Sequence, residues 1–153
     1  MKNRKVFTIG TANRRAGEFI DLLREEEIAV LADVRSVPWS ALDQFRKENL
    51  ARLCMDAGIE YLWLGAALGG FRDEGYEAYM KTAAFRDALC SLEERAARMR
   101  TAICCAEAEP WRCHRWLIAG ALHRRGWTVV HILGPGERMR HTDLSFYRSP
   151  PPT

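Results

Sequence analysis

The segment CAEAEPWRCHR, residues 105–115, holds two thiols, two carboxylates, one imidazole and two guanidiniums within eleven positions. These groups can support two kinds of chemistry. A cysteine thiolate acts as a nucleophile or a redox group, whereas Cys, His and Glu donors together can bind zinc. The elements that carry these residues decide which chemistry is available.

Cys113 is the strongest candidate for thiol chemistry. Pro110 is favoured at the first position of a helix, and the sequence predicts a helix over residues 110–125. Cys113 then lies in the opening turns, between Arg112 and His114. Helix amides and nearby cations lower the pKa of a thiol, which favours a nucleophilic or redox role. The competing interpretation is an inert cysteine packed under the helix.

Other groups in the segment could assist. Glu107 follows an apolar run, where partial burial would raise its pKa into the range of an acid–base catalyst, and His114 is a second candidate for proton transfer. For Cys105 we expect packing more than reactivity. Cys105, Glu107, Cys113 and His114 also form a zinc donor set. That alternative is less favoured, because adjacent side chains in a helix diverge by about 100°. No cofactor is assigned.

Apolar runs between polar, helix-patterned segments predict the elements that position these groups. The expected strands cover residues 5–10, 29–34, 59–64, 101–106 and 128–133. Helical spacing of apolar residues separates successive strands, except that the stretch after residue 64 begins as a glycine-containing loop. The pattern predicts a single α/β three-layer sandwich, with a mostly parallel sheet of about five strands and helices on both faces.

Composition limits the setting of the protein. Residues 1–134 form the predicted domain, and residues 135–153 form an irregular C-terminal tail with a disordered end. The five cysteines are odd in number and two are adjacent, which is typical of reduced thiols rather than a disulfide framework. No apolar run reaches the length of a membrane span, and the start lacks a signal-peptide pattern. We therefore expect a cytoplasmic protein without a membrane partner.

Polar residues follow the predicted strands, and the carboxyl ends of parallel strands meet at one edge of a sheet. Arg35, Arg72 and Arg115 are candidates to hold an anion, because the guanidinium fork suits phosphate and carboxylate. Asp33 could act as a base, although an ion pair with Arg35 is the favoured interpretation. The further binding candidates at this edge are Thr11, Ser36, Gly69 and Gly70. The two glycines could let the backbone approach a ligand closely, although a plain turn is the favoured interpretation.

Several motifs occur in an order that resembles the family catalogued as domain of unknown function 488. They are TIG, DVRSVPWS, FRKENLA, GIEYLWL, LGGFR, YMKTAAF, CAEAEPWRCHR and HIL with a downstream histidine. The resemblance spans nearly the whole chain and implies a compact α/β fold with a shared polar edge, but no reaction. The family pattern matches Asp33, Arg35, Ser36, Gly69, Gly70, Arg72, Cys105, Glu107, Cys113, His114 and Arg115. The family commonly has His-Ser after TIG, where this chain has Thr11 and Ala12.

Two function classes follow. The leading hypothesis is a thiol-dependent enzyme acting on a small anionic or nucleotide-like substrate, with Cys113 as nucleophile or redox thiol. The rival is a non-catalytic module that recognises an anion or the phosphates of nucleic acid. Charges are spread along the chain without a long basic run, so the sequence allows nucleic-acid binding without indicating it. Oligomeric state is left open.

Overall fold

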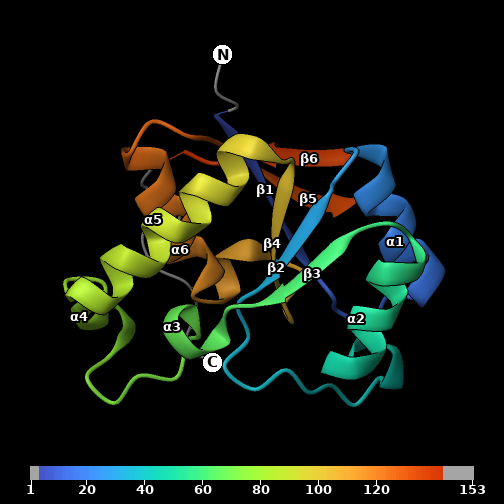
Figure 1. Cartoon of the computed structure of the whole chain (residues 1–153), viewed down its shortest axis with the longest axis horizontal. Coiled ribbons are helices and arrows are strands. Elements are labelled where there is room, and N and C mark those ends of the chain that lie inside the picture. Colours follow the sequence, from blue (N-terminus) through green and yellow to red (C-terminus); the bar gives the residue numbers. More distant parts are fainter. Residues whose placement is uncertain (1–3, 143–153) are drawn as a thin grey trace.

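A mixed sheet of six strands organises residues 4–142, the part of the chain that the computed structural model describes (Figure 1). The strand order is β3-β2-β4-β1-β5-β6. Neighbouring strands are parallel except for the β5–β6 pair, which is antiparallel. The strands are β1 (Lys5–Gly10), β2 (Val30–Asp33), β3 (Glu60–Trp63), β4 (Thr101–Cys105), β5 (Thr128–Gly134) and β6 (Glu137–Arg140).

Helices cover both faces of this sheet. In Figure 1, α1 and α2 lie on one side of it and α5 and α6 on the other. The long helices are α1 (Ala16–Glu25), α2 (Lys47–Asp56), α5 (Ala83–Arg98) and α6 (Arg115–Arg124). The short ones are α3 (Gly65–Leu68), α4 (Tyr76–Tyr79) and the 3-10 turns η1 (Asp43–Phe45) and η2 (Pro110–Arg112). The predicted α/β sandwich is confirmed.

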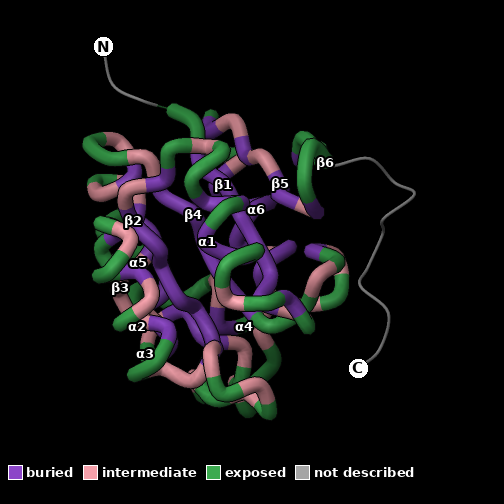
Figure 2. Tube along the Cα trace, turned by 90° about the vertical axis from the view of Figure 1, so that its right-hand side faces the viewer, coloured by how far each residue is buried: buried purple, intermediate pink, exposed green. Residues whose placement is uncertain are grey.

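Each face of the sheet has its own apolar core. One contains Phe19, Leu50 and Cys104, and the other contains Leu89, Ile118 and Cys105. Alternation along β4 therefore sends the two adjacent cysteines to opposite faces. The central strands β1 and β4 are buried along nearly their whole length, as Figure 2 shows. Burial on both faces explains why their sequences read as continuous apolar runs.

The structure corrects several expectations. Residues 137–140 form β6, although they were assigned to the irregular tail, and the predicted disordered end lies outside the described residues. The predicted helix over 110–125 is split into η2 and α6, with Cys113 extended between them. Cys90, in α5, is an exposed free cysteine. None of the helices between residues 4 and 142 has the length and apolar character of a membrane span.

Candidate functional site

The candidate site lies where the ends of β1 and β4 meet. Gly10 and Cys105, the last residues of these two strands, stand opposite each other in the parallel register. The chain leaves β1 toward α1 on one face of the sheet and leaves β4 toward α6 on the other (Figure 1). Such a reversal is where open α/β sheets commonly bind ligands.

Backbone contacts hold the chain beyond these strand ends. The N–H of Thr11 donates to the carbonyl of Cys105 at 2.8 Å, and the N–H of Ala12 donates to the carbonyl of Ala106 at 2.8 Å. A Cβ added at Gly10 would lie 1.7 Å from the carbonyl oxygen of Glu107. Only glycine permits this approach, so the loop after β4 is fixed against the end of β1.

Cys105 and Cys113 form a pair of free thiols. Their Sγ atoms lie 2.8 Å apart, and Cys113 is partly exposed whereas Cys105 is only 2 % exposed. Burial opposes ionisation of Cys105, but the hydrogen bond from Cys113 and the charge of Arg115 lower the pKa of the Cys105 thiol to about 7. The hydrogen bond to Cys105, together with burial, raises the pKa of Cys113. The two shifts together favour ionisation of Cys105 first, with a proton kept on Cys113.

Arg115 is the cation behind this pair. Its side chain is 0 % exposed, and its Nη2 donates to the backbone carbonyls of Glu107 at 3.1 Å and Ala108 at 3.4 Å. Its Nε and Nη1 atoms are buried without a hydrogen-bond partner. Among residues 4–142, no Asp or Glu forms an ion pair with it. An unpaired buried charge is costly, so a negative charge on the neighbouring cysteine pair would offset it.

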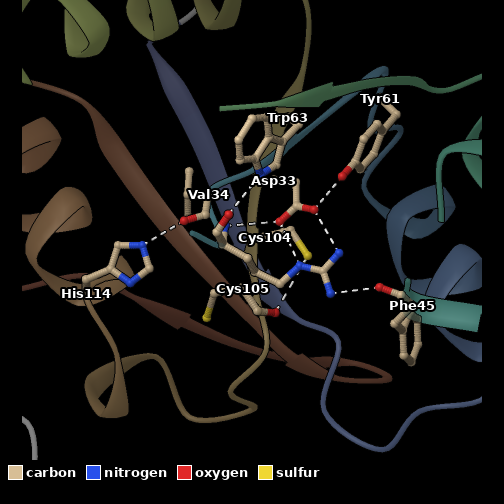
Figure 3. A network of polar contacts seen from close by, with 9 residues as sticks. Asp33, Val34, Phe45, Tyr61, Trp63, Cys104, Cys105 and His114 are labelled. Atoms are coloured by element: carbon tan, nitrogen blue, oxygen red, sulfur yellow. Dashed lines mark hydrogen bonds and ion pairs between the residues drawn. The ribbon is translucent and has the colours of Figure 1, made fainter. Parts of the chain in front are cut away.

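Arg35 and Asp33 form a buried ion pair at the end of β2, as the favoured interpretation had it. Nε and Nη2 of Arg35 donate to the two carboxylate oxygens of Asp33 at 2.9 and 2.8 Å, and Nη1 donates to the carbonyl of Phe45 at 2.7 Å. The hydroxyl of Tyr61 donates to the same carboxylate at 2.5 Å. Figure 3 shows the hydroxyl of Tyr61 pointing toward the carboxylate of Asp33. Every nitrogen of this guanidinium that can donate is engaged within the protein.

His114, placed next to Cys113, also has a fixed position. Its Nε2 lies 2.9 Å from the carbonyl of Val34, the contact drawn in Figure 3. A Cβ at Gly70 would lie 2.7 Å from its Nδ1, so the ring packs directly on that glycine. Burial lowers the pKa of His114 despite the hydrogen bond to Val34. The imidazole therefore connects the start of α6 to the end of β2.

The other residues predicted at this edge, Ser36, Gly69 and Arg72, contact the loops next to the end of β2. The hydroxyl of Ser36 accepts a hydrogen bond from the N–H of Phe71 at 3.0 Å, and a Cβ at Gly69 would lie 2.2 Å from that hydroxyl. Arg72 donates to the carbonyls of Gly69 and Ala66 at 3.1 and 2.8 Å, and its guanidinium lies 3.8 Å from the ring centroid of Tyr79. These contacts hold the loop after α3 against the end of β2.

Two other predicted residues have different surroundings from those expected. The side chain of Glu107 is exposed, where partial burial was expected, and the backbone of this residue rather than its carboxylate contacts Arg115. Thr11 is buried, and its backbone N–H is the group that pairs with Cys105. Arg112 forms its ion pair with Glu109.

A buried histidine chain beside Arg115 was not identified as a functional feature from the sequence. His131 is 0 % exposed; its Nδ1 lies 2.6 Å from the Thr8 hydroxyl, and its Nε2 lies 3.0 Å from Nδ1 of His141. Burial and the charge of Arg115 lower the pKa of His131 to about 2. His131 is therefore neutral near pH 7 and adds no positive charge beside Arg115. The sequence feature that could have indicated this chain is the position of His131, a titratable residue inside the apolar run TVVHIL.

Zinc binding was the third hypothesis for this segment. Among residues 4–142, no three His, Cys, Asp or Glu side chains are arranged to hold a metal ion. Cys105 and Cys113 do meet, but His114 faces Val34 and Gly70, and the Glu107 side chain is exposed. The four donors of the expected zinc set therefore do not converge on one position.

The sequence family fits this arrangement. The family described as Domain of unknown function DUF488 matches residues 15–122, more than two thirds of the chain. The protein belongs to the DUF488 family. No curated protein and no solved structure matches it at a significant level. The matched range contains Cys105, Cys113 and Arg115, so the thiol pair and its cation lie within the DUF488 region.

Proposed function

We propose that this DUF488 protein is a thiol-dependent enzyme whose reactive group is the Cys105–Cys113 pair. The observation that carries the proposal is the 2.8 Å contact between the two Sγ atoms, placed at the switch point of the sheet. A thiol hydrogen-bonded to a thiolate has a proton acceptor already in contact. It can then attack without waiting for solvent to remove its proton.

The different burial of Cys113 and Cys105 supports different roles for the two residues. Cys113 is partly exposed and meets the substrate, whereas Cys105 is buried against the loop after β4. Cys113 Sγ attacks an electrophilic atom while its proton moves to Cys105 Sγ. Arg115 is a positioning residue, because its charge favours the thiolate without contacting the reacting substrate atom.

The arginines expected to hold an anionic substrate are engaged within the protein. Arg35 and Arg72 donate to a carboxylate and to backbone carbonyls, and so hold loops rather than present free donors. Arg115 is buried together with its two unpartnered nitrogens, so its charge acts on the sulfurs and not as a hydrogen-bond donor to the substrate. No contact among the described residues favours the alternative of a nucleic-acid-binding module.

The test is the alkylation rate of Cys113 with iodoacetamide near pH 7, followed by peptide mass mapping. A C90S background removes the exposed thiol, while burial raises the pKa of Cys104 and raises that of Cys54 to about 12, so both stay protonated. We expect Cys113 to react faster than a free model thiol. In Cys105→Ser its rate should fall about tenfold or more, because no thiolate remains in contact with Cys113 to accept its proton.

Cys54→Ser is the matched control, because it removes a buried thiol from the opposite core and leaves the pair untouched. It should leave the Cys113 rate unchanged. Circular dichroism checks that both variants fold. A Cys113 rate equal to that of the model thiol, or unaffected by Cys105→Ser in folded protein, would contradict the proposed function.

A further inference from the structure

The pair contains more than a nucleophile and a base. Cysteine nucleophiles that perform acyl transfer are commonly served by histidine, which accepts a proton without competing for the substrate. Here the adjacent imidazole is engaged: His114 Nε2 contacts the Val34 carbonyl and its ring packs on Gly70. The proton acceptor in contact with Cys113 is a second sulfur. A second sulfur can do what an imidazole cannot, which is to form a bond to the first.

The two sulfurs are held so that such a bond needs little movement. Cys105 ends a central strand and is paired through its carbonyl to Thr11, while Cys113 lies in an extended link directly before α6. The residues are eight positions apart, so a disulfide between them would close only a short loop. A group attached to Cys113 would be within reach of attack by Cys105.

From this geometry we propose, on the basis of the proposed function, that the substrates are small disulfides and that the protein reduces them by cycling between dithiol and disulfide. Only a sulfur-linked adduct on Cys113 can be resolved by Cys105, because the leaving group must depart as a thiolate. Partial exposure of Cys113 and near-complete burial of Cys105 favour small substrates over folded protein disulfides.

The substrate disulfide is reduced in two successive thiol–disulfide exchanges. Cys113 Sγ attacks one sulfur of R–S–S–R′ as its proton passes to Cys105; the S–S bond breaks and RS⁻ leaves. The proton on Cys105 then passes to RS⁻, giving RSH. The Cys105 thiolate attacks Cys113 Sγ, and R′S⁻ leaves as the Cys105–Cys113 disulfide forms. The protein loses two electrons and the substrate disulfide gains them. An external dithiol restores the reduced pair by the same exchange.

Arg115 biases this cycle toward the reduced form. The thiolate is the anion that offsets the buried guanidinium, and oxidation removes that charge. Stabilising the reduced form makes a disulfide easier to reduce. External dithiol should therefore regenerate the pair readily, as turnover requires.

The test treats reduced C90S protein with hydroxyethyl disulfide and maps the products by mass spectrometry. We expect an intramolecular Cys105–Cys113 disulfide, seen as the loss of two hydrogens, and its return to dithiol on addition of dithiothreitol. Cys105→Ser should stop at a mixed disulfide on Cys113, and Cys54→Ser should behave as the parent does.

The two proposals fail in different ways. If C90S protein accumulates an unresolved mixed disulfide, or retains both thiols, while Cys113 still alkylates rapidly in a Cys105-dependent manner, the disulfide substrate is wrong and the thiol enzyme stands. If Cys113 also alkylates no faster than a model thiol, the proposed function fails with it.

Discussion

A guanidinium with no exposed surface is an unusual neighbour for a cysteine. The Arg115 side chain donates to two backbone carbonyls of the loop after β4, and two of its nitrogens are buried without a hydrogen-bond partner. A thiolate on the cysteine pair would offset its charge. The hydrogen bond from Cys113 and the charge of Arg115 together lower the pKa of the Cys105 thiol to about 7.

The substitution Arg115→Met removes the positive charge while it keeps most of the packed side-chain volume. Methionine fills a similar volume, and removing an unpaired buried charge should leave the protein folded. The pKa of the pair then rises toward the ordinary value of a thiol, so alkylation near pH 7 falls about tenfold for each unit gained. The check is a pH–rate profile: Arg115→Met should approach the parent rate above about pH 9.

Arg115→Lys keeps the charge and should restore part of the rate near neutral pH. A folded Arg115→Met protein with an unchanged pH–rate profile would mean that Arg115 does not tune the thiols.

The ends of β1 and β4 form the element that holds the pair together. Gly10 lies against the carbonyl of Glu107 so closely that a Cβ would fall 1.7 Å from that oxygen. Gly10→Ala must therefore displace backbone, and we expect a loss of about 1–3 kcal/mol in the free energy of unfolding, as for other overpacked sites. Urea denaturation measures this change.

Gly17→Ala is the matched control for Gly10→Ala, because Gly17 lies in α1 and a Cβ there meets nothing within 4 Å. Alanine is favoured over glycine inside a helix, so this variant should gain up to about 1 kcal/mol. If both variants have the same stability, Gly10 does not fix the loop after β4.

At this scale much of the fold could be predicted from the sequence. The run TAICCA predicted β4, because a strand buried on both faces is apolar along its length. β6 could not be predicted, since its sequence ERMR lacks alternation and pairs only along the edge next to β5. The interruption of the helix at Cys113 could not be predicted either, because helix-favouring residues continue on both sides of it.

The arrangement of the whole molecule brings the site together. The sheet order places β1 beside β4, although 90 or more residues separate them in the chain, and the two connections leave on opposite faces (Figure 1). Strand order is a property of tertiary packing, so the sequence predicted that polar groups share one edge but not which of them meet. The 2.8 Å contact of Cys105 with Cys113 was therefore not predictable from spacing.

The same packing explains which predicted residues hold loops. Arg35, Ser36, Gly69 and Arg72 match the family pattern, and each contacts backbone or side chains of the loops around the site. Residue type alone could not distinguish such a role from substrate binding, because a guanidinium donates equally well to a carbonyl and to a phosphate.

The central claim is that the folded protein holds one thiolate, shared by Cys105 and Cys113, near neutral pH. Titration of thiolate ultraviolet absorbance in the C90S protein tests it most directly. We predict a titration step of one thiolate per chain with a midpoint near 7, the pKa of the Cys105 thiol. The step should be absent in Cys105→Ser and shifted upward in Arg115→Met. Unfolding should abolish the step. A folded protein that forms no thiolate until the ordinary range of a free thiol, about pH 8.5, would contradict the account.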